Sequence, residues 1–287
     1  MIRLLPMLSA AHKRIYEFIN NPENASWESM TLEASARQRD HYEQIHDVYE
    51  RHYYDNTSML YREEFIFRLI CRDLDLNGKR VAELASGSGH NSLALMARYP
   101  EIDLVGFDIS PSACNEYRRS TGFPCHELDL TEPADITEQV DMAFIIGGLH
   151  HCVADLPQTL ANAAKLVKPG GLFVMQEPNS QFFLEAVRKA WYRVDSSFDA
   201  ATEHALNHDD LVRMGGDQFS CRDLTYFGGP GYFAILNSMI LRIPLAVKPI
   251  ISPPLMVAER VWNRLPGRAM HNVFLARWDR TEAPAGD

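Results

Sequence analysis

The feature that most constrains the fold is a short strand that ends in an acid and runs directly into a glycine turn. Residues 81–91 read Val-Ala-Glu-Leu-Ala-Ser-Gly-Ser-Gly-His-Asn. Gly87 and Gly89 can adopt positive φ angles and bring bare backbone against a ligand. A helix predicted from Asn91 would then point its free amide end at that ligand. The pattern indicates a nucleotide-type cofactor pocket, but a dinucleotide fingerprint needs a third glycine where Ser92 stands, which disfavours NAD.

Three further apolar runs of strand length follow, each separated from the next by helical or turn segments. They cover residues 102–107, 140–146 and 172–177. The first run ends on Asp108, roughly 20 residues after the glycines, which is the spacing of an acid that binds ribose hydroxyls. The alternation of strands and helices predicts a parallel, doubly wound α/β sheet. Residues 271–278 are expected to form a final, hairpin-paired strand.

Together these motifs resemble those of the class I S-adenosylmethionine-dependent methyltransferases, and specifically the type 11-like group that acts on small molecules. The resemblance covers about residues 80–179 and includes the turn Lys-Pro-Gly-Gly at 168–171. It implies a seven-stranded, mostly parallel, Rossmann-like sheet, S-adenosylmethionine as the cofactor and methyl transfer as the activity. The family's first glycine is replaced here by Ala85, which is still compatible with a strand end.

The resemblance also implies which residues bind the cofactor. Glu83 would anchor the ammonium end of the methionine group, Asp108 the ribose, and Asp129 with Leu130 the adenine. An ionised carboxylate suits a diol because it accepts both hydroxyl donors. A lone acid at a strand end is more often a helix cap, so the joint spacing of the acids behind the glycines carries this prediction. The complete predicted set is Tyr54, Arg62, Glu83, Ala85, Gly87, Gly89, Asp108, Ile109, Asp129, Leu130 and Gly147. Of these, Tyr54 and Arg62 belong to a flank that would close over the cofactor and hold its carboxylate.

Three histidines are candidate general bases. A sulfonium carries an activated methyl group, so the protein mainly has to align a nucleophile in a dry site, and a base is needed only for an un-ionised acceptor. His150 and His151 follow the strand that would face the methyl group, and His208 lies in a later helix. Histidine can act as a base near neutral pH. A structural hydrogen-bonding role is the competing interpretation.

Composition limits the partners. The chain has 287 residues, a formal net charge of -10 and no cluster of Lys and Arg, which disfavours nucleic acid. The five cysteines are scattered without paired spacing, so no metal site is predicted. No run is typical of a signal peptide or a membrane span, so a cytoplasmic protein is expected. The expected ligands are S-adenosylmethionine and a small-molecule substrate.

The chain divides into four predicted segments. These are an N-terminal helical lid (1–79), the cofactor-binding core with its following helices (80–227), an apolar helical insert (228–270), and the final strand with a disordered tail (271–287). The insert is too apolar for a solvated loop, and helices are expected at 232–243 and 255–265. Four roles are open for it: a lid over an acceptor pocket, a homodimer surface, a patch on a membrane surface or, for residues 233–243, a plain core helix. The first is preferred and membrane contact is not favoured.

The resulting hypothesis is S-adenosylmethionine-dependent O- or N-methylation of a small molecule, such as an apolar natural product or a lipid-linked acceptor. The alternative is a non-catalytic methyltransferase-fold subunit that uses the insert as its interface. The intact Gly87, Gly89 and Asp108 argue against the alternative, because such subunits often lose these residues.

Overall fold

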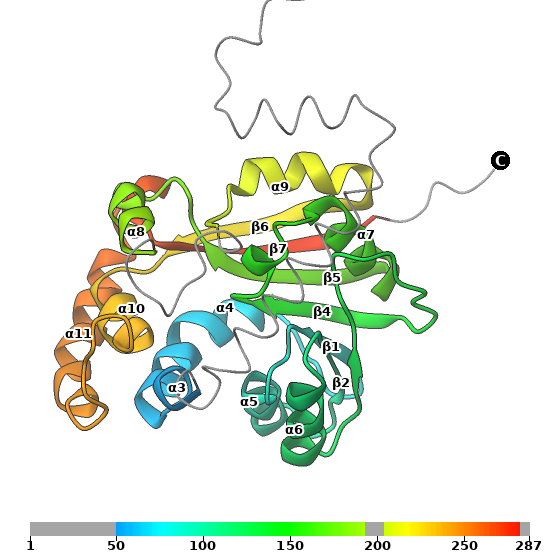
Figure 1. The fold of residues 1–287 in the computed structure, drawn as a ribbon, viewed down its shortest axis with the longest axis horizontal. Coiled ribbons are helices and arrows are strands. Elements are labelled where there is room, and N and C mark those ends of the chain that lie inside the picture. Colours follow the sequence, from blue (N-terminus) through cyan, green and yellow to red (C-terminus); the bar gives the residue numbers. More distant parts are fainter. Residues whose placement is uncertain (1–49, 193–203, 282–287) are drawn as a thin grey trace, which may run out of the picture.

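A seven-stranded sheet forms the central layer of the computed structural model, which describes residues 50–192 and 204–281 (Figure 1). The strands are β1 (Arg80–Leu84), β2 (Asp103–Asp108), β3 (Cys125–Glu127), β4 (Val140–Ile146), β5 (Val167–Pro178), β6 (Phe219–Phe227) and β7 (Val273–Arg280). Their spatial order is β3-β2-β1-β4-β5-β7-β6. Strands β1 to β5 pair in parallel, and β7 lies antiparallel between β5 and β6. The predicted doubly wound, mostly parallel sheet with a hairpin-paired last strand is confirmed.

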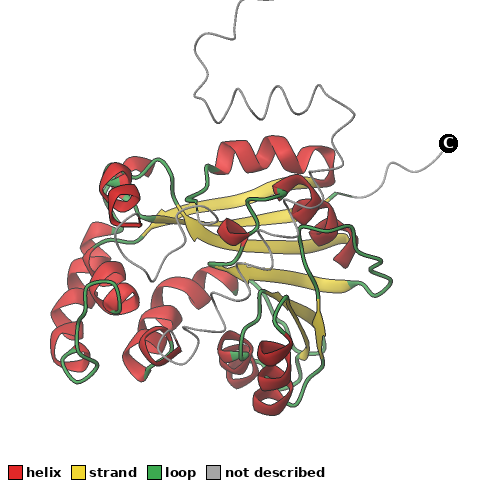
Figure 2. Ribbon diagram, viewed as in Figure 1, coloured by secondary structure: helices red, strands yellow, loops and turns green. Residues whose placement is uncertain are grey.

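Helices cover both faces of this sheet (Figure 2). The longer ones are α3 (Asn56–Arg62), α5 (His90–Arg98), α6 (Pro111–Thr121), α7 (Leu156–Leu166), α8 (Glu185–Tyr192), α9 (His208–Gly215), α10 (Pro230–Ile235) and α11 (Lys248–Trp262). The shorter ones are η2 (Glu63–Phe67), α4 (Arg68–Ile70), η3 (Leu149–His151), η4 (Gly216–Gln218), η5 (Leu236–Ser238) and η6 (Arg268–Met270). Helices α7 and α9 share one core with the sheet, while α4, α5 and the start of the insert share the other.

The central parallel strands are largely apolar because both of their faces are buried. In β1, Ala82 and Leu84 enter the core under α7, whereas Val81 enters the core under α5. Such strands lack the polar alternation of a sheet with one wet face. Helix starts follow the strands closely and are capped by side chains: Ser110 accepts from the amide of Ala113 at the start of α6. The carboxyl ends of the strands therefore open onto helix amino termini at one edge of the sheet.

The insert differs from its predicted helices. Helix α10 ends at Ile235, η5 continues it for one turn, and the chain then bends at Arg242, whose φ is 52°. Helix α11 begins at Lys248 rather than after the last proline of the run. Pro249 is tolerated because the first turn of a helix needs no amide donors. Pro253 cannot donate to the carbonyl of Pro249, and the hydroxyl of Ser252 donates to it instead, at 3.3 Å.

The insert is joined to the N-terminal flank by buried polar contacts, and we call the two segments, residues 52–64 and 228–262, the cap. The ammonium of Lys248 is fully buried and pairs with the carboxylate of Asp55. The hydroxyl of Tyr61 donates to Glu259 at 2.6 Å. Glu259 also accepts from the amides of Gly229 and Gly231, at 2.9 and 2.8 Å. These contacts fix α3 to α10 and α11, which lie together at the lower left of Figure 1.

Within residues 50–192 and 204–281, no helix is both long enough and apolar enough to cross a bilayer. Residues 1–49 of the predicted lid and the predicted disordered tail after Thr281 lie outside the described residues.

Candidate functional site

Three alternate residues with left-handed backbone shape the loop between β1 and α5. Gly87 and Gly89 have φ angles of 50° and 85°, and Ala85 also has a φ of 50°. A Cβ on Gly87 would meet none of the described atoms within 4 Å, so the space in front of it is open to a ligand. A Cβ on Gly89 would lie 2.7 Å from a methyl of Thr121, so this glycine lets α6 pack closely. Ala85 is not in the relaxed strand-end conformation expected from the sequence, because an L-residue at this φ is strained.

Asp108 holds this loop from the end of β2. Its two carboxylate oxygens accept from the amide of Gly87 at 2.8 Å and from the amide of Ser110 at 2.9 Å. Each oxygen has a further lone pair, so the carboxylate keeps the capacity to accept from a diol. The acid predicted to bind the ribose therefore also supports the glycine loop, so its removal would affect both ribose binding and the conformation of the loop.

The predicted adenine-binding residues directly follow the neighbouring strand, β3. The amide of Leu128 donates to the carbonyl of Asp108 at 2.9 Å, which ties the end of β3 to the end of β2. Asp129 accepts from the amide and the hydroxyl of Thr131, at 2.9 and 2.7 Å. Leu130 is buried, and Ile109 is half-buried beside Asp108. The tertiary structure thus brings the two predicted acids to one edge of the sheet.

Glu83 is buried beneath the first turn of α5. It accepts from the side-chain amide of Asn91 at 2.9 Å, and from the backbone amide and hydroxyl of Ser92 at 3.1 and 2.5 Å. Burial raises the pKa of Glu83 to about 7, against the effect of these donors. Ser92 therefore has a structural reason to occupy the position where a dinucleotide-binding loop has glycine.

Arg62 and Tyr54 reach the same helix start from the cap. The guanidinium of Arg62 lies 4.5 Å from the centroid of the Tyr54 ring and donates to Asn91 at 3.3 Å. The Tyr54 ring stacks on His90 with centroids 4.5 Å apart. Arg62 is 4% exposed and contributes to the cavity described next. A buried cation beside the amide end of α5 is well placed for a carboxylate.

A cavity of about 280 Å³ lies beyond Gly147, at the carboxyl ends of β4 and β5. The strands, the loops after them, α8 and the cap all contribute to its wall. Its lining consists of Tyr53, Arg62, Ile146, Gly147, His150, His151, Gln176, Pro178, Phe182, Leu184, Val187, Arg188, Tyr232, Phe233, Leu236, Asn237, Ile240, Leu241 and Asn272. Gly147 has a φ of 65°, and a Cβ there would reach only His150, at 3.9 Å, among the described residues. Ligands of open α/β sheets bind at this edge.

His150 is held by a buried acid from β5. Its Nδ1 lies 2.7 Å from Oε2 of Glu177, and its backbone amide donates to the same oxygen at 3.2 Å. The other oxygen of Glu177 accepts from the amides of Gly148 and Leu149, at 3.1 and 2.8 Å. Burial raises the pKa of Glu177 to about 8. Burial, followed by the charge of Arg188, lowers the pKa of His150 to about 3. Burial therefore disfavours the charged form of both groups.

The other two candidate bases are placed differently. His151 also lines the cavity, and its ring centroid lies 3.9 Å from that of His150. His208 lies in the core under α9, where its Nε2 accepts from the indole of Trp278 at 3.1 Å and its ring packs edge-on against Phe274. Burial lowers the pKa of His208. The structure does not bring His208 to the cavity, so its observed role is structural and it is omitted from the site proposed below.

Several residues in or beside the cavity escaped the sequence prediction. Glu177 could have been found, because it is an acid at the carboxyl end of a predicted parallel strand, the position at which ligands bind in this class of sheet. Gln176 and Tyr232 had no such signal. Tyr232 and the other cap residues reach the cavity only because the cap folds back over β5, which no local pattern encodes.

Comparisons with known proteins agree with this geometry. Residues 82–173 match a protein-family model described as a methyltransferase domain. Trans-aconitate 2-methyltransferase of Methylobacterium nodulans is 29% identical over 104 residues, a match that spans 35% of this chain and only 39% of that protein. A chain from the Haloferax volcanii complex between the Trm112 methyltransferase activator and its candidate methyltransferase superposes with a TM-score of 0.56 at 18% identity, covering 86% of this chain and 99% of that one.

The N-methyltransferase NodS of Bradyrhizobium japonicum WM9, solved with S-adenosyl-L-homocysteine, has a TM-score of 0.50 at 12% identity and covers 79% of this chain and 89% of that one. At such identities the likeness shows the shared fold. The open cradle at Gly87, the acid at the end of β2 and the buried cation of Arg62 fit the ribose and the amino-acid end of S-adenosylmethionine. Residues 82–173 thus match a methyltransferase domain, and the fold is shared with a methyltransferase solved with S-adenosyl-L-homocysteine, which supports S-adenosylmethionine as the cofactor.

Proposed function

We propose that this protein transfers a methyl group from S-adenosylmethionine to an oxygen or nitrogen atom of a small, largely apolar molecule. The observation that carries the proposal is the position of the cavity, which adjoins Gly147 at the end of β4 and shares Arg62 with the predicted cofactor site. An acceptor in this cavity would lie on the side of the sheet edge from which the methyl group can be reached.

Different residues of the chain would bind different parts of the cofactor. Asp108 would accept from the ribose hydroxyls, Asp129 and the backbone of Leu130 would face the adenine, and Arg62 with Tyr54 would hold the carboxylate. Glu83 would orient the first turn of α5 toward the amino-acid end through Asn91 and Ser92. The bound cofactor supplies a methyl group already activated on a sulfonium, so alignment and exclusion of water are the main tasks of the protein.

The pair formed by His150 and Glu177 would remove the acceptor's proton. When Glu177 is ionised, Nδ1–H of His150 donates to it and Nε2 is left as the basic atom toward the cavity. Nε2 of His150 would take the proton from the acceptor, and the cofactor, when bound, would supply the methyl group and leave as S-adenosyl-L-homocysteine. Because burial raises the pKa of Glu177 to about 8, this form of the pair gains population as the pH rises toward 8. His151, whose ring is tilted against that of His150, would line the same end of the cavity.

A second candidate is a methyltransferase-fold subunit that acts through a partner. It is favoured by one observation, the fold shared with a chain solved in complex with the Trm112 activator. The open cradle at Gly87 and the cavity beyond Gly147 support a catalytic protein instead, since a purely structural subunit needs neither.

Calorimetric titration with S-adenosyl-L-homocysteine and with NAD tests the cofactor assignment. The first ligand is expected to bind and the second is not. Asp108→Asn should weaken binding by at least tenfold, whereas the control Asp103→Asn, an exposed acid at the other end of β2, should leave it unchanged. Transfer of labelled methyl to phenols and amines that bear apolar groups then separates the enzyme from the subunit. Binding of NAD alone would refute the family-based site, and cofactor binding without any transfer would favour the subunit.

A further inference from the structure

The cavity has two chemically different ends. Its inner end, at the strand termini, presents the polar side chains of Arg62, His150 and Gln176. The more exposed part of its lining includes apolar side chains from α8, α10 and the segment after η5, among them Val187, Phe233 and Ile240. A ligand that satisfies both ends must be polar where the methyl group is accepted and apolar beyond it.

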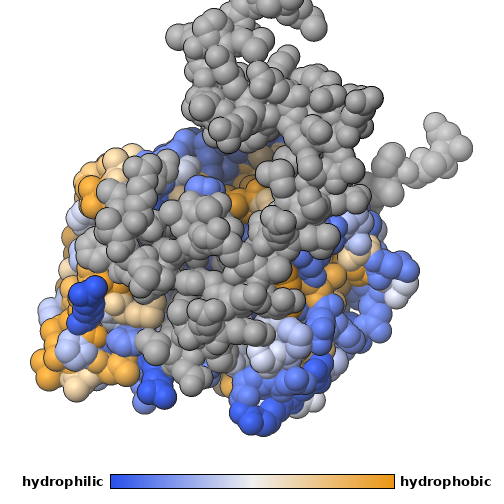
Figure 3. Space-filling view, viewed as in Figure 1, coloured by the Kyte–Doolittle hydropathy of each residue, from blue (hydrophilic) through white to orange (hydrophobic). Residues whose placement is uncertain are grey.

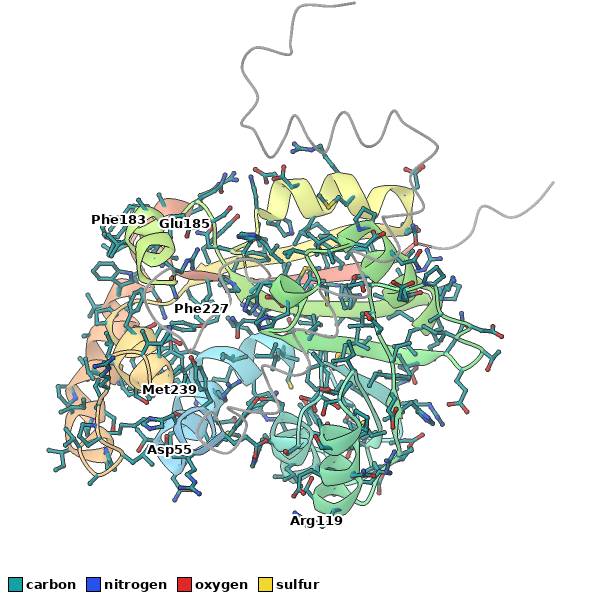
Figure 4. The ribbon with its side chains drawn as sticks, in the orientation of Figure 1. Asp55, Arg119, Phe183, Glu185, Phe227 and Met239 are labelled. Atoms are coloured by element: carbon teal, nitrogen blue, oxygen red, sulfur yellow. The ribbon has the colours of Figure 1, made fainter. Side chains whose placement is uncertain are left out.

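The apolar wall continues out to the protein surface. Leu184, Val187 and Leu241 line the cavity, yet they are 39%, 58% and 45% exposed. Leu184 and Val187 come from the α8 region and Leu241 from the segment after η5, so the three side chains face the cavity from two separate elements. Figure 3 shows apolar surface over α8 and over the α10–α11 region, and Figure 4 shows α8, marked by Phe183 and Glu185, and the segment marked by Met239 at the same end of the molecule. These exposed side chains give the mouth of the cavity an apolar part, beside polar lining residues such as Tyr53, Arg188 and Asn237.

We propose that the acceptor is an amphiphile whose polar head lies beside His150 and whose hydrocarbon chain leaves the cavity through this mouth, between Val187 and Leu241. This inference rests on the proposed function and deepens it. The volume of about 280 Å³ is at the lower limit for a pocket that encloses a drug-sized molecule, so head and chain would not both fit inside. A chain that crosses the mouth would cover the apolar side chains that are otherwise left in water.

Straight-chain carboxylates of 6, 8, 10 and 12 carbons are the probes, titrated below their micelle concentrations into the full-length protein saturated with S-adenosyl-L-homocysteine. Each added methylene is expected to tighten Kd, by up to about fourfold if it is fully buried. Val187→Asp should weaken binding of the 12-carbon probe by at least tenfold and that of the 6-carbon probe far less. Val261→Asp is the matched control, because Val261 is 59% exposed on α11 and is outside the described cavity lining.

Affinity that does not depend on chain length, or equal effects of the two Asp variants, would overturn the inference. A protein mass by light scattering that is doubled in the parent and halved only in Val187→Asp, with unchanged probe binding, would make the mouth a contact between two copies and would also overturn it. The titrations are repeated without S-adenosyl-L-homocysteine, so that a failure of the cofactor site leaves the dependence on chain length measurable. If S-adenosyl-L-homocysteine binds but the affinity for the probes does not depend on their chain length, this inference is refuted and the proposed function is not.

Discussion

Replacement of Glu177 by Gln tests the role assigned to the buried acid. The carboxylate accepts from three backbone amides and lies against Nδ1 of His150. A Gln side chain offers one accepting oxygen and one donating amide. If the Gln oxygen still accepts from the backbone amides of Gly148 and Leu149, the NH2 group of Gln faces the backbone N–H of His150 and donates to Nδ1 of the imidazole. The imidazole would then carry its proton on Nε2 and would lose its basic atom toward the cavity.

The expected loss follows from that change of tautomer. General base catalysis typically contributes about 10²- to 10⁴-fold, so kcat should fall by about that factor while KM for S-adenosylmethionine stays within about twofold. Leaving the amide of His150 without an acceptor should cost about 1–3 kcal/mol of stability near pH 5. In the parent, kcat should rise with pH up to about 8, because burial raises the pKa of Glu177 to about 8. In Glu177→Gln this rise of kcat with pH should be absent.

The contribution of Glu177 to stability should fall as the pH rises, whereas kcat should increase. The pKa of Glu177 is raised by burial from 4.5 in its ordinary state to about 8, so the folded protein binds the proton more tightly than the unfolded chain. The contribution is complete below pH 4.5 and is lost as the pH rises toward 8. The difference in unfolding free energy between parent and Glu177→Gln should therefore shrink between pH 5 and pH 8 in urea titrations.

The assays are pH profiles of kcat with an acceptor found by the transfer screen, together with urea unfolding at both pH values. Glu138→Gln, which changes an exposed acid paired with Arg80, is the matched control and should behave as the parent does. A Glu177→Gln enzyme that keeps both the parent's kcat and its rise with pH would refute the assignment of His150 as the base.

Three further changes test other parts of the structure. Ala85→Gly should raise the unfolding free energy by about 0.5–1 kcal/mol, because glycine relieves the left-handed strain while costing some chain entropy; unchanged or lower stability in urea would contradict the strained φ. Lys248→Met should lower stability by about 2–4 kcal/mol, because it leaves the partly buried carboxylate of Asp55 without its cation, and the loss should be smaller in the Asp55→Asn background if the pair is the cause. Asp108→Ala should weaken S-adenosyl-L-homocysteine binding by about 2 kcal/mol, and because Asp108 also holds the amide of Gly87, it should lower the thermal midpoint without ligand, whereas parent-like binding by calorimetry would mean that the ribose lies elsewhere.

The cofactor side of the site could be predicted from the sequence to a large extent. Its residues lie at strand ends in the order of the chain, and the backbone of a parallel sheet brings those ends to one edge whatever the distant packing is. Gly87, Asp108 and Asp129 meet there for that reason. The local pattern did not reveal that Ala85 is strained or that Asp108 supports the loop, because both depend on contacts across the sheet edge.

The acceptor side could not be predicted in the same way. Tyr232, Gln176 and Leu241 are far apart in sequence and carry no common motif, and they share a cavity only because the cap folds over the ends of β4 and β5. The helices of the insert were misplaced for a related reason: the predicted boundary followed the prolines, whereas the buried pair of Lys248 and Asp55 fixes the first turn of α11 upstream of them.

The sequence by itself thus determined the sheet, the glycine loop and the acids at its edge, since these follow from local periodicity and from the chirality of strand connections. The tertiary structure alone decided which histidine faces the cavity. His150 and His208 are the same residue type and were both predicted as candidate bases, but one is placed against Glu177 beside a cavity and the other against Trp278 in the core. The physical reason is that burial and the choice of hydrogen-bond partner are properties of packed elements, and these set whether an imidazole can meet a substrate.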